Sequence, residues 1–233
     1  QTMPVLANVL LVAAKDRLAV TGTDLEVELV AAAEVAVQQP GEVTVPGRKF
    51  LDIVRTLPEK TTVTVSREGE KIVVRAGRSR FSLSTLPASE FPLVEDIQGK
   101  QLLKLTRAGL RRMFEKTHFA MAQQDVRYYL NGTLLETDGK ILRAVATDGH
   151  RLALAELKAP KGSDKLTGVI VPRKTVNEIR RLIDGRTDEV AVEVSDTKIV
   201  VRAGRAVLTS KLIDGSFPDY ARVIPKGNDK KLT

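Results

Sequence analysis

Histidine and cysteine, which often carry out acid–base, nucleophilic or metal chemistry, are scarce in this sequence. The 233 residues include two histidines, His118 and His150, and no cysteine. The absence of cysteine excludes disulfides, thiolate metal sites and cysteine nucleophiles, and it fits a reducing compartment. There is no zinc-protease histidine pair, P-loop or Rossmann glycine pattern. Asp148-Gly149-His150 suggests a metal site or an acid–base pair, but a strand end followed by a binding loop explains these residues better.

Basic residues form the second group with a chemical role. Lys and Arg number 37 against 29 Asp and Glu, a formal net charge of +8, and the isoelectric point is about 9.7. Residues 1–100 carry 12 basic and 13 acidic side chains, whereas residues 101–233 carry 25 and 16. An excess of this size favours a polyanionic partner when it gathers on particular elements.

The basic side chains recur at helical spacing, where residues four or seven apart share a face. Such pairs are Arg107 with Arg111, Arg112 with Lys116, Arg173 with Arg180, Lys174 with Arg181, and Arg48 with Arg55. Few acids oppose them, namely Asp52, Glu115 and Glu178. Long cationic side chains on rigid helices suit phosphate contacts that carry no base information. The alternative is a solvated charged face, but recurrence on equivalent helices favours nucleic acid.

An internal repeat organises the elements that carry these side chains. Ile72–Arg78 recurs letter for letter as Ile199–Arg205, at an offset of 127 residues. Four shorter pairs follow at nearly the same offset: Thr23-Asp24 and Thr147-Asp148, Val45-Pro46 and Val171-Pro172, Arg48-Lys49 and Arg173-Lys174, and Phe91-Pro92 and Phe217-Pro218. Collinear matches of this kind indicate a duplicated domain. The counterpart of Asp148-Gly149-His150 is Asp24-Leu25-Glu26, so a duplicated metal site is excluded.

The spacing of apolar residues predicts few helices and many strands. Helices are expected at Arg48–Leu57, at Thr106–Phe119 with Thr106 as N-cap, and at Arg173–Ile183. Strands are expected at Leu102–Leu105, Tyr129–Glu136, Ile141–Thr147, Val190–Val194, Ile199–Arg202 and Ala206–Lys211, with Asp138-Gly139 as a hairpin turn. Each complete copy then has two helices and about eight strands. The predicted class is α+β, with duplicated domains whose two helices pack on antiparallel sheets.

The two copies differ in extent. The second begins with a strand and a helix that have no counterpart in the first, where Gln1 already aligns near Asp125. About two dozen N-terminal residues are therefore expected to be missing from the first copy, and Lys231–Thr233 to lie where another copy would start. The predicted domains are residues 1–98 and 99–228, joined through a linker at 93–101.

Composition narrows the class of protein. Hydrophobic residues make up 42% and charged residues 28%, enough for a core, and the 4% of aromatic residues makes that core aliphatic. The longest apolar stretch near the start, Val5–Ala14, is too short to span a bilayer, and no basic segment precedes it. These features predict a soluble cytoplasmic protein.

Four longer strings carry a family resemblance: Gly77–Pro87, Gln124–Gly132, Ala146–Ala153 and Phe217–Tyr220. Together they resemble the bacterial DNA polymerase III β subunit family, the sliding clamps, and the resemblance runs in order through the whole chain. It implies a DNA-clamp fold with three similar domains per chain, and head-to-tail dimers closed into a ring around duplex DNA. Helices would line the hole and sheets the outside. This chain would cover most of the first domain, all of the second and none of the third.

The resemblance also implies three sets of site residues. DNA would be contacted by Arg48, Gln124, Tyr128 and Tyr129, with Lys49, Arg173 and Lys174 as pore neighbours. A partner-peptide pocket would use Leu130, Thr147, Gly149, His150, Arg151, Leu152, Pro218, Arg222 and Val223. The ring interface would use Lys71, Arg78, Arg80, Phe81 and Leu83. Core packing remains the alternative interpretation of Leu130 and Leu152.

The implied function is that of a non-catalytic processivity factor for the replicative polymerase. Its partners would be double-stranded DNA without sequence preference, a second copy of the full-length chain, and polymerase, clamp loader and repair proteins that dock through short linear peptides. No cofactor, metal or membrane is expected. One alternative is a duplicated DNA-binding scaffold that forms no ring; topology separates the two, because a ring protein stays on circular DNA and slips from linear ends. A hydrolase that uses His150 is the other, and a turnover assay with His150 substituted tests it.

Overall fold

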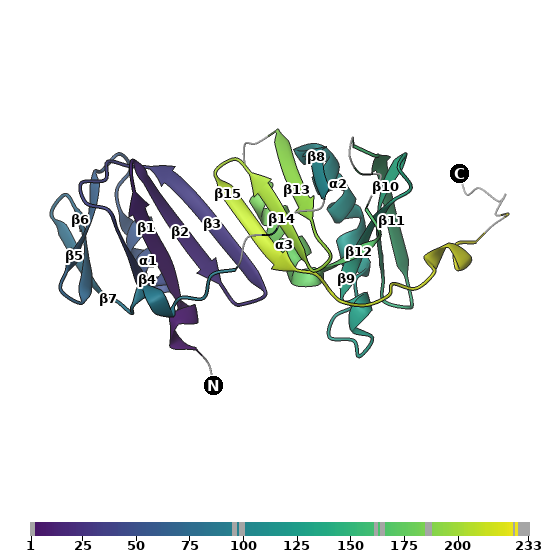
Figure 1. The fold of residues 1–233 in the computed structure, drawn as a ribbon, viewed down its shortest axis with the longest axis horizontal. Coiled ribbons are helices and arrows are strands. Elements are labelled where there is room, and N and C mark those ends of the chain that lie inside the picture. The colour runs from purple at the N-terminus through teal and green to yellow at the C-terminus, as the bar shows by residue number, and fades with distance from the viewer. Residues whose placement is uncertain are drawn as a thin grey trace.

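The computed structural model describes residues 3–94, 97, 101–160, 163, 166–184, 188–225 and 227. It contains two α+β units that lie side by side along the long axis of the molecule (Figure 1). Every pair of strands in the described part is antiparallel. The predicted α+β class with antiparallel sheets is therefore confirmed.

The first unit has seven strands and one α-helix in the described residues. In chain order they are β1 (Asn8–Ala14), β2 (Arg17–Thr23), β3 (Val27–Glu34), β4 (Gly41–Pro46), α1 (Gly47–Thr56), β5 (Val63–Glu68), β6 (Lys71–Ala76) and β7 (Ser79–Ser84). Strands β1 to β4 pair in the order β4-β1-β2-β3, and a separate sheet has the order β5-β6-β7.

The second unit repeats this pattern with one further strand and helix at its start. Its elements are β8 (Gln101–Thr106), α2 (Arg107–Thr117), β9 (Gly132–Thr137), β10 (Ile141–Thr147), β11 (Leu152–Lys158), β12 (Val169–Pro172), α3 (Arg173–Leu182), β13 (Glu189–Val194), β14 (Lys198–Ala203) and β15 (Ala206–Lys211). One sheet has the order β11-β10-β9-β12, and β15-β14-β13-β8 forms the other. The sequence repeat makes β3 equivalent to β11, α1 to α3, and β7 to β15.

A single eight-stranded sheet joins the two units, because β3 pairs with β15. The ladder extends past the strand ends, with the Lys211 amide donating to the Glu26 carbonyl at 3.0 Å. Two ion pairs cross the same joint, Lys174 with Asp24 and Arg205 with Glu34. Figure 1 shows β3 and β15 adjacent at the centre of the molecule. The first unit thus presents its β3 edge to the β15 edge of the second.

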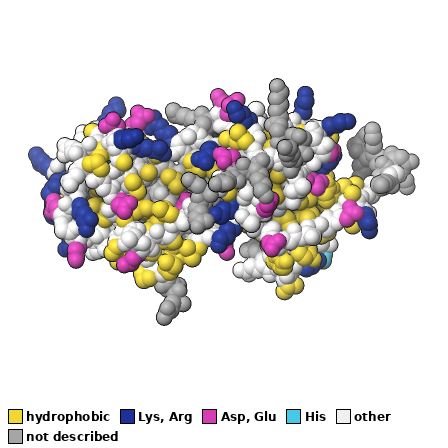
Figure 2. Space-filling view, viewed as in Figure 1, with side chains coloured by type: hydrophobic (Ala, Val, Ile, Leu, Met, Phe, Trp, Pro, Cys, Tyr) yellow, Lys and Arg dark blue, Asp and Glu magenta, His cyan; other side chains and the backbone are white. Residues whose placement is uncertain are grey.

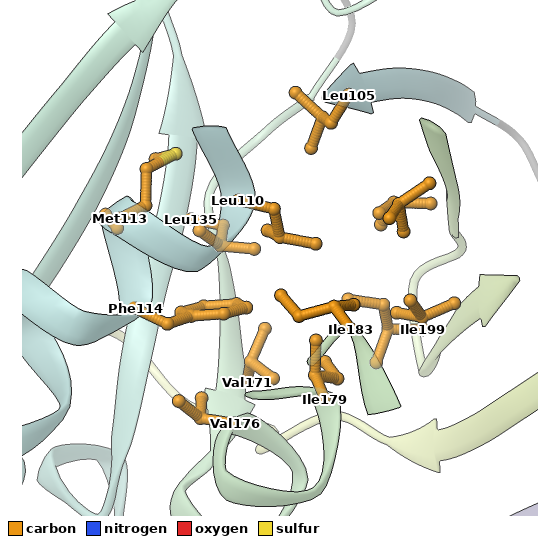
Figure 3. Packing of buried hydrophobic residues seen from close by; sticks show 14 of the residues in the cluster. Leu105, Leu110, Met113, Phe114, Leu135, Val171, Val176, Ile179, Ile183 and Ile199 are labelled. Carbon is orange, nitrogen blue, oxygen red and sulfur yellow. The ribbon is translucent and has the colours of Figure 1, made fainter. Parts of the chain in front are cut away.

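The larger core belongs to the second unit and draws side chains from both helices and both sheets (Figure 3). Leu110, Met113 and Phe114 of α2 pack with Val176 and Ile179 of α3, and all five are buried. Thr106 caps α2 as predicted, because its hydroxyl accepts from the Gly109 amide at 3.1 Å.

The equivalent helix of the first unit, α1, is far less covered. Leu51 and Val54 are 46% and 45% exposed, whereas their counterparts Val176 and Ile179 are fully buried. The cause is that no helix among the described residues of the first unit takes the place of α2. Phe50 and Ile53 hold α1 to the smaller core of that unit.

Some element ends differ from the sequence prediction. The strand expected from Tyr129 begins at Gly132, because Tyr128–Leu130 form a 3-10 turn. The Asn131 side chain closes the preceding loop by bonding both the amide and the carbonyl of Asp125 at 3.0 Å. The helix expected up to Phe119 ends at Thr117 and continues as a 3-10 turn, His118–Ala120.

No helix in the described ranges is long and apolar enough to cross a membrane.

Candidate functional site

The first turns of α1 and α3 carry the four basic residues predicted to face DNA. Arg48 and Lys49 are exposed on α1, and neither has an ion-pair partner among the described residues. Arg173 is half-buried, and its guanidinium donates to the Met121 carbonyl at 2.9 Å. Lys174 is exposed but paired with Asp24 across the joint. The α1 pair is thus open to a ligand, whereas the α3 pair also holds neighbouring segments.

Ion pairs neutralise more of the basic side chains on α2 and α3 than their helical spacing in the sequence indicated. Arg111 is paired with Glu115 at 2.7 Å and with Asp184 at 2.5 Å, and Arg181 with Glu178 at 2.7 Å. Asp184 and Asp24 lie outside the three helices, so helical spacing alone missed them. Arg55, Arg112 and Lys116 are exposed without such partners in the described part of the chain. On the face shown in Figure 2, basic and acidic side chains are interspersed over both units.

The loop between the 3-10 turn η3 (His118–Ala120) and β9 carries the other predicted DNA contacts. Gln124 and Tyr128 are exposed, and Gln124 adopts a positive φ of 54°. Tyr129 is half-buried and packs against the outer face of the β9–β12 sheet. The two tyrosine rings meet edge to face with centroids 5.8 Å apart. The loop therefore offers one exposed aromatic ring and one that anchors it.

The predicted pocket residues Thr147–Leu152 form a tight turn between β10 and β11. The Thr147 hydroxyl donates to the Arg151 carbonyl at 2.7 Å and accepts from the Gly149 amide at 3.1 Å. The Asp148 carboxylate accepts from the His150 and Arg151 amides, each at 3.0 Å. These amide bonds, with help from the Arg151 side chain, lower the pKa of Asp148 to about 2. The first unit has the same turn, where the Asp24 carboxylate accepts from the Glu26 and Val27 amides.

Gly149 has a positive φ of 87°, which disfavours any other residue at this position. The space beside it is occupied, since a methyl group there would lie 3.0 Å from Nη1 of Arg127. Arg151 lies 5.7 Å from the centroid of the half-exposed Phe119 ring, in cation–π geometry. His150 is exposed. The turn is therefore held by the Thr147 and Asp148 side chains, which bond its backbone amides. The side chains of His150 and Arg151 are exposed on it.

Neither histidine belongs to a metal-ligating group in the part of the chain that the structure describes. The Nδ1 atom of His118 lies 3.0 Å from the Phe114 carbonyl at the end of α2, and Asp148 is already committed to the turn. No group of three or more metal-ligating residues occurs in the described ranges.

The C-terminal segment of the second unit covers the outer face of the β9–β12 sheet. Leu152, Phe217 and Tyr220 are partly buried in one apolar cluster on Leu134 and Ile170. The Tyr220 hydroxyl also donates to the Glu136 carboxylate, and burial, followed by this contact, raises the pKa of Tyr220 to about 12. The structure thus brings Leu152 and the segment after β15 together in one apolar cluster.

Beside this segment lies an open groove of about 460 Å³. Its walls include Leu134, Glu136, Gly168 and the stretch Gly215–Ala221. Of the predicted pocket residues, only Pro218 lines it. Arg222 and Val223 lie beyond, at 84% side-chain exposure and 69% exposure, and the Arg222 guanidinium pairs with Asp219 at 2.7 Å.

Leu130 departs from its predicted role as a pocket wall. It is 2% exposed, so its side chain belongs to the interior, which was the alternative interpretation. Leu152 is only half-buried and keeps an accessible part.

The predicted ring-interface residues lie on β6, β7 and the turn that joins them. Lys71, Arg78 and Arg80 are exposed, and Arg80 pairs with Glu68 at 2.8 Å. Of the two apolar residues predicted at this interface, Leu83 is 5% exposed, and it packs with the partly buried Phe81 into the core of the unit. Alternation along the strand turns both side chains inward. What remains outside is a charged face and the backbone edge of β7.

Three residues that the sequence interpretation did not assign help to build the site. Asp125 and Arg127 form an ion pair inside the Gln124–Tyr129 loop, which we call the tyrosine loop. The Glu136 carboxylate accepts a hydrogen bond from the Tyr220 hydroxyl. Asp125 and Arg127 lie within the string that carried the family resemblance, which was the available signal. Nothing in the sequence pattern linked Glu136 to Tyr220, 84 residues away.

Comparison with known proteins assigns both units. Residues 1–95 match the family model described as the DNA polymerase III beta subunit, N-terminal domain, and residues 104–219 match its central domain. The beta sliding clamp of Escherichia coli strain K12 is 52% identical over 233 residues, which cover 99% of this chain and 63% of that protein. The chain thus spans about 63% of the length of its curated relatives.

Solved structures give the same result. A Pseudomonas aeruginosa sliding clamp bound to griselimycin superposes with a TM-score of 0.93 at 51% identity, covering 98% of this chain and 62% of that one. The Caulobacter crescentus pol III beta structure gives a TM-score of 0.94 at 44% identity, covering 99% and 64%.

Proposed function

The chain belongs to the DNA polymerase III beta subunit family, the beta sliding clamps, and from that premise we propose that it forms part of a ring-shaped DNA clamp. Such a clamp is a non-catalytic processivity factor: it encircles duplex DNA in the cytoplasm and tethers the replicative polymerase to it. We further propose that residues 1–98 and 99–228 are its first and second domains.

The observation that carries this proposal is the joint between the two units. Strand β3 of the first unit pairs with β15 of the second. The equivalents of these strands, β11 and β7, each end a sheet with no further strand beside them in the described residues. One joint and two open edges of matching type permit the same head-to-tail contact to repeat, and such a repeat closes a ring when its rotation adds up to a full turn.

We assign the β7 edge as the ring interface. Lys71, Arg78 and Arg80 would supply charged contacts, while the β7 backbone would pair with a β11-like edge of another domain. Phe81 and Leu83 would stiffen the strand from within the core. The β3–β15 joint supports this arrangement, because it also combines a backbone ladder with flanking ion pairs.

DNA binding is assigned to the helix starts and the tyrosine loop: Arg48, Lys49, Gln124, Tyr128, Tyr129, Arg173 and Lys174. The exposed Arg48 and Lys49 suit phosphate contacts, and the exposed Tyr128 ring suits contact with the sugar–phosphate backbone. Because such contacts read no bases, binding is expected to be weak and independent of sequence.

Retention on DNA tests the ring. The full-length protein, loaded on nicked circular DNA, is expected to stay bound at high salt and to be lost when the circle is cut. Equal retention on circular and linear DNA would instead favour the scaffold that forms no ring.

The salt dependence of DNA binding tests the phosphate contacts. Replacing Arg48 and Lys49 by Ala is expected to lower the slope of log K on log salt by about 0.9 for each lost phosphate contact, equally for all DNA sequences. Arg202→Ala, on the sheet, serves as the control.

Partner peptides are assigned to the turn and the segment after β15. Thr147, Gly149, His150, Arg151 and Leu152 would form one side, and Pro218, Arg222 and Val223 the other, with Leu130 supporting the floor from the interior. The half-buried Leu152 and the exposed Val223 offer apolar surface, while Arg151 and Arg222 lie at the rim. In this proposal the two sides enclose an apolar cleft with a charged rim, which suits a short linear peptide from polymerase, clamp loader or repair proteins.

Griselimycin, which a P. aeruginosa relative binds, is the probe for this cleft. Titration of the full-length protein is expected to shift amide resonances of Thr147–Leu152, and Leu152→Asp is expected to abolish these shifts. Leu102→Asp is the matched control, because Leu102 is 47% exposed on β8. Shifts that survive Leu152→Asp unchanged would refute the cleft assignment.

A further inference from the structure

Arg127 lies at the centre of the loop that carries the proposed DNA contacts, but its guanidinium points to other parts of the protein. Its Nε and Nη2 atoms donate to both carboxylate oxygens of Asp125, at 3.0 and 2.8 Å. The Asp125 carboxylate also accepts from the Arg127 amide at 2.8 Å. This two-bond fork is the strongest geometry available to an arginine–carboxylate pair. We call the pair of Asp125 and Arg127 the loop clip.

Arg127 of the loop clip also contacts the Thr147–Leu152 turn between β10 and β11. Nη2 of Arg127 donates to the Asp148 carbonyl at 3.3 Å, and Nη1 fills the space beside Gly149. Asp148 and Gly149 belong to the turn that would hold partner peptides, whereas Gln124 and Tyr128 flank the clip in the loop that would hold DNA. One side chain therefore contacts both proposed surfaces.

Electrostatics favour a fixed clip. Arg127 lowers the pKa of Asp125 to about 2, and Asp125 in turn raises that of Arg127. Both groups therefore stay charged throughout the physiological range. Asp125 is 23% exposed and Arg127 46%, so the pair lies at the surface yet remains joined by three hydrogen bonds.

We propose that Arg127 is a positioning residue that links the two proposed surfaces rather than a phosphate contact. With Asp125 it holds the Gln124–Tyr129 loop against the Asp148-Gly149 turn, so that a ligand in the cleft orders the loop as well. This inference rests on the proposed function, since it deepens the assignment of the cleft and of the DNA loop.

Two variants of the full-length protein test it, with Arg202→Ala as control. Arg202 is also a surface arginine paired with a glutamate, at 2.9 Å, but it lies on β14. Arg127→Ala removes the clip and a charge, whereas Asp125→Asn breaks the fork and retains the arginine. Both are expected to weaken griselimycin binding about tenfold, because the turn and loop must then be ordered on binding. The salt slope of DNA binding is expected to remain that of the control, whereas a phosphate contact would lower it by about 0.9 in Arg127→Ala.

Hydrogen exchange provides the readout that loss of stability alone would not change. In the wild-type protein, griselimycin is expected to slow exchange in both segments 124–131 and 147–152. In Arg127→Ala and Asp125→Asn the slowing is expected to stay confined to 147–152. A lower salt slope for Arg127→Ala, unchanged griselimycin affinity, or slowing in both segments of the variants would each overturn the proposal.

The ligand-free protein separates this proposal from the proposed function. The Gly149, His150 and Arg151 amides are bonded within the turn, and their exchange is expected to accelerate in Asp125→Asn. If the wild-type protein failed to bind griselimycin or DNA, the proposed function would fail while this exchange still tested the clip. Unchanged exchange in Asp125→Asn would refute the clip alone.

Discussion

At the scale of single residues, aspartate carboxylates hold the turns and the loop of the candidate site in place. Asp148 and Asp138 each cap a turn by accepting two backbone amides, and the pKa of each is lowered to about 2. Asp125 reaches a similar pKa mainly through Arg127. Each carboxylate accepts hydrogen bonds from neighbouring groups. The Asp148 carboxylate bonds the His150 and Arg151 amides and the Arg151 side chain, and no bond joins it to the His150 ring.

The pH dependence of stability follows from these carboxylates. The pKa of Asp148 lies below its unfolded value of 3.8, so the stabilisation is present above that value and is lost as the pH falls from about 4 to 2. Asp148→Asn is expected to lose less stability over that interval than the wild-type protein. Urea denaturation between pH 7 and pH 2 measures this, and carboxyl NMR titration gives the pKa directly. An Asp148 pKa near 3.8 would contradict the capping role.

At the scale of elements, equivalent helices have different surroundings. The repeat pairs Arg48-Lys49 with Arg173-Lys174, so α1 and α3 begin with the same basic residues. However, α3 is covered by α2, while α1 has Leu51 and Val54 exposed. The basic helix starts are thus common to both units, whereas burial of the opposite face depends on a neighbouring helix.

This difference predicts unequal effects of equivalent truncations. Ile179→Ala removes a fully buried side chain and is expected to cost about 2–5 kcal/mol. Val54→Ala, at the equivalent place on α1, is expected to change the free energy of unfolding by no more than about 0.5 kcal/mol. Urea denaturation of this chain compares the two. A large loss for Val54→Ala would show that α1 is covered in solution.

At the scale of the whole molecule, one continuous eight-stranded sheet runs through both units. The β3–β15 ladder and the ion pairs Lys174–Asp24 and Arg205–Glu34 all cross the joint. In the proposed ring, the shape of the hole depends on how the domains are set against one another, and contacts of this kind at the joint would fix that arrangement. Coupled unfolding of the units is the measurable consequence.

Lys211→Pro tests that coupling, because it removes the amide that donates to Glu26 across the joint. All three tyrosines, Tyr128, Tyr129 and Tyr220, lie in the second unit, so tyrosine fluorescence reports on that unit and far-ultraviolet circular dichroism on both. The two urea transitions are expected to coincide in the wild-type chain and in Lys211→Ala, which keeps the amide. They are expected to separate in Lys211→Pro. Separate transitions in the wild-type chain would show that the units unfold independently.

The sequence by itself determined the repeated architecture of this protein, because apolar periodicity, caps and turn residues act locally. The three helices, the Asp138-Gly139 hairpin and the Thr106 cap were all predictable for that reason. The exact repeat of Ile72–Arg78 also revealed the duplication, and the family strings indicated where the candidate sites lie. The absence of cysteine and of histidine clusters excluded several catalytic chemistries from residue types alone.

Only the tertiary structure decided which side chains remain available. Leu130 and Leu83 are apolar residues of candidate sites, and packing, not spacing, placed them in the interior. Asp24 and Asp184 neutralise Lys174 and Arg111 from distant parts of the chain, so helical spacing could not reveal them. The link from Arg127 to Asp148 and Gly149 likewise joins segments about 20 residues apart. Such contacts depend on how the chain returns on itself, and that information is absent from local sequence patterns.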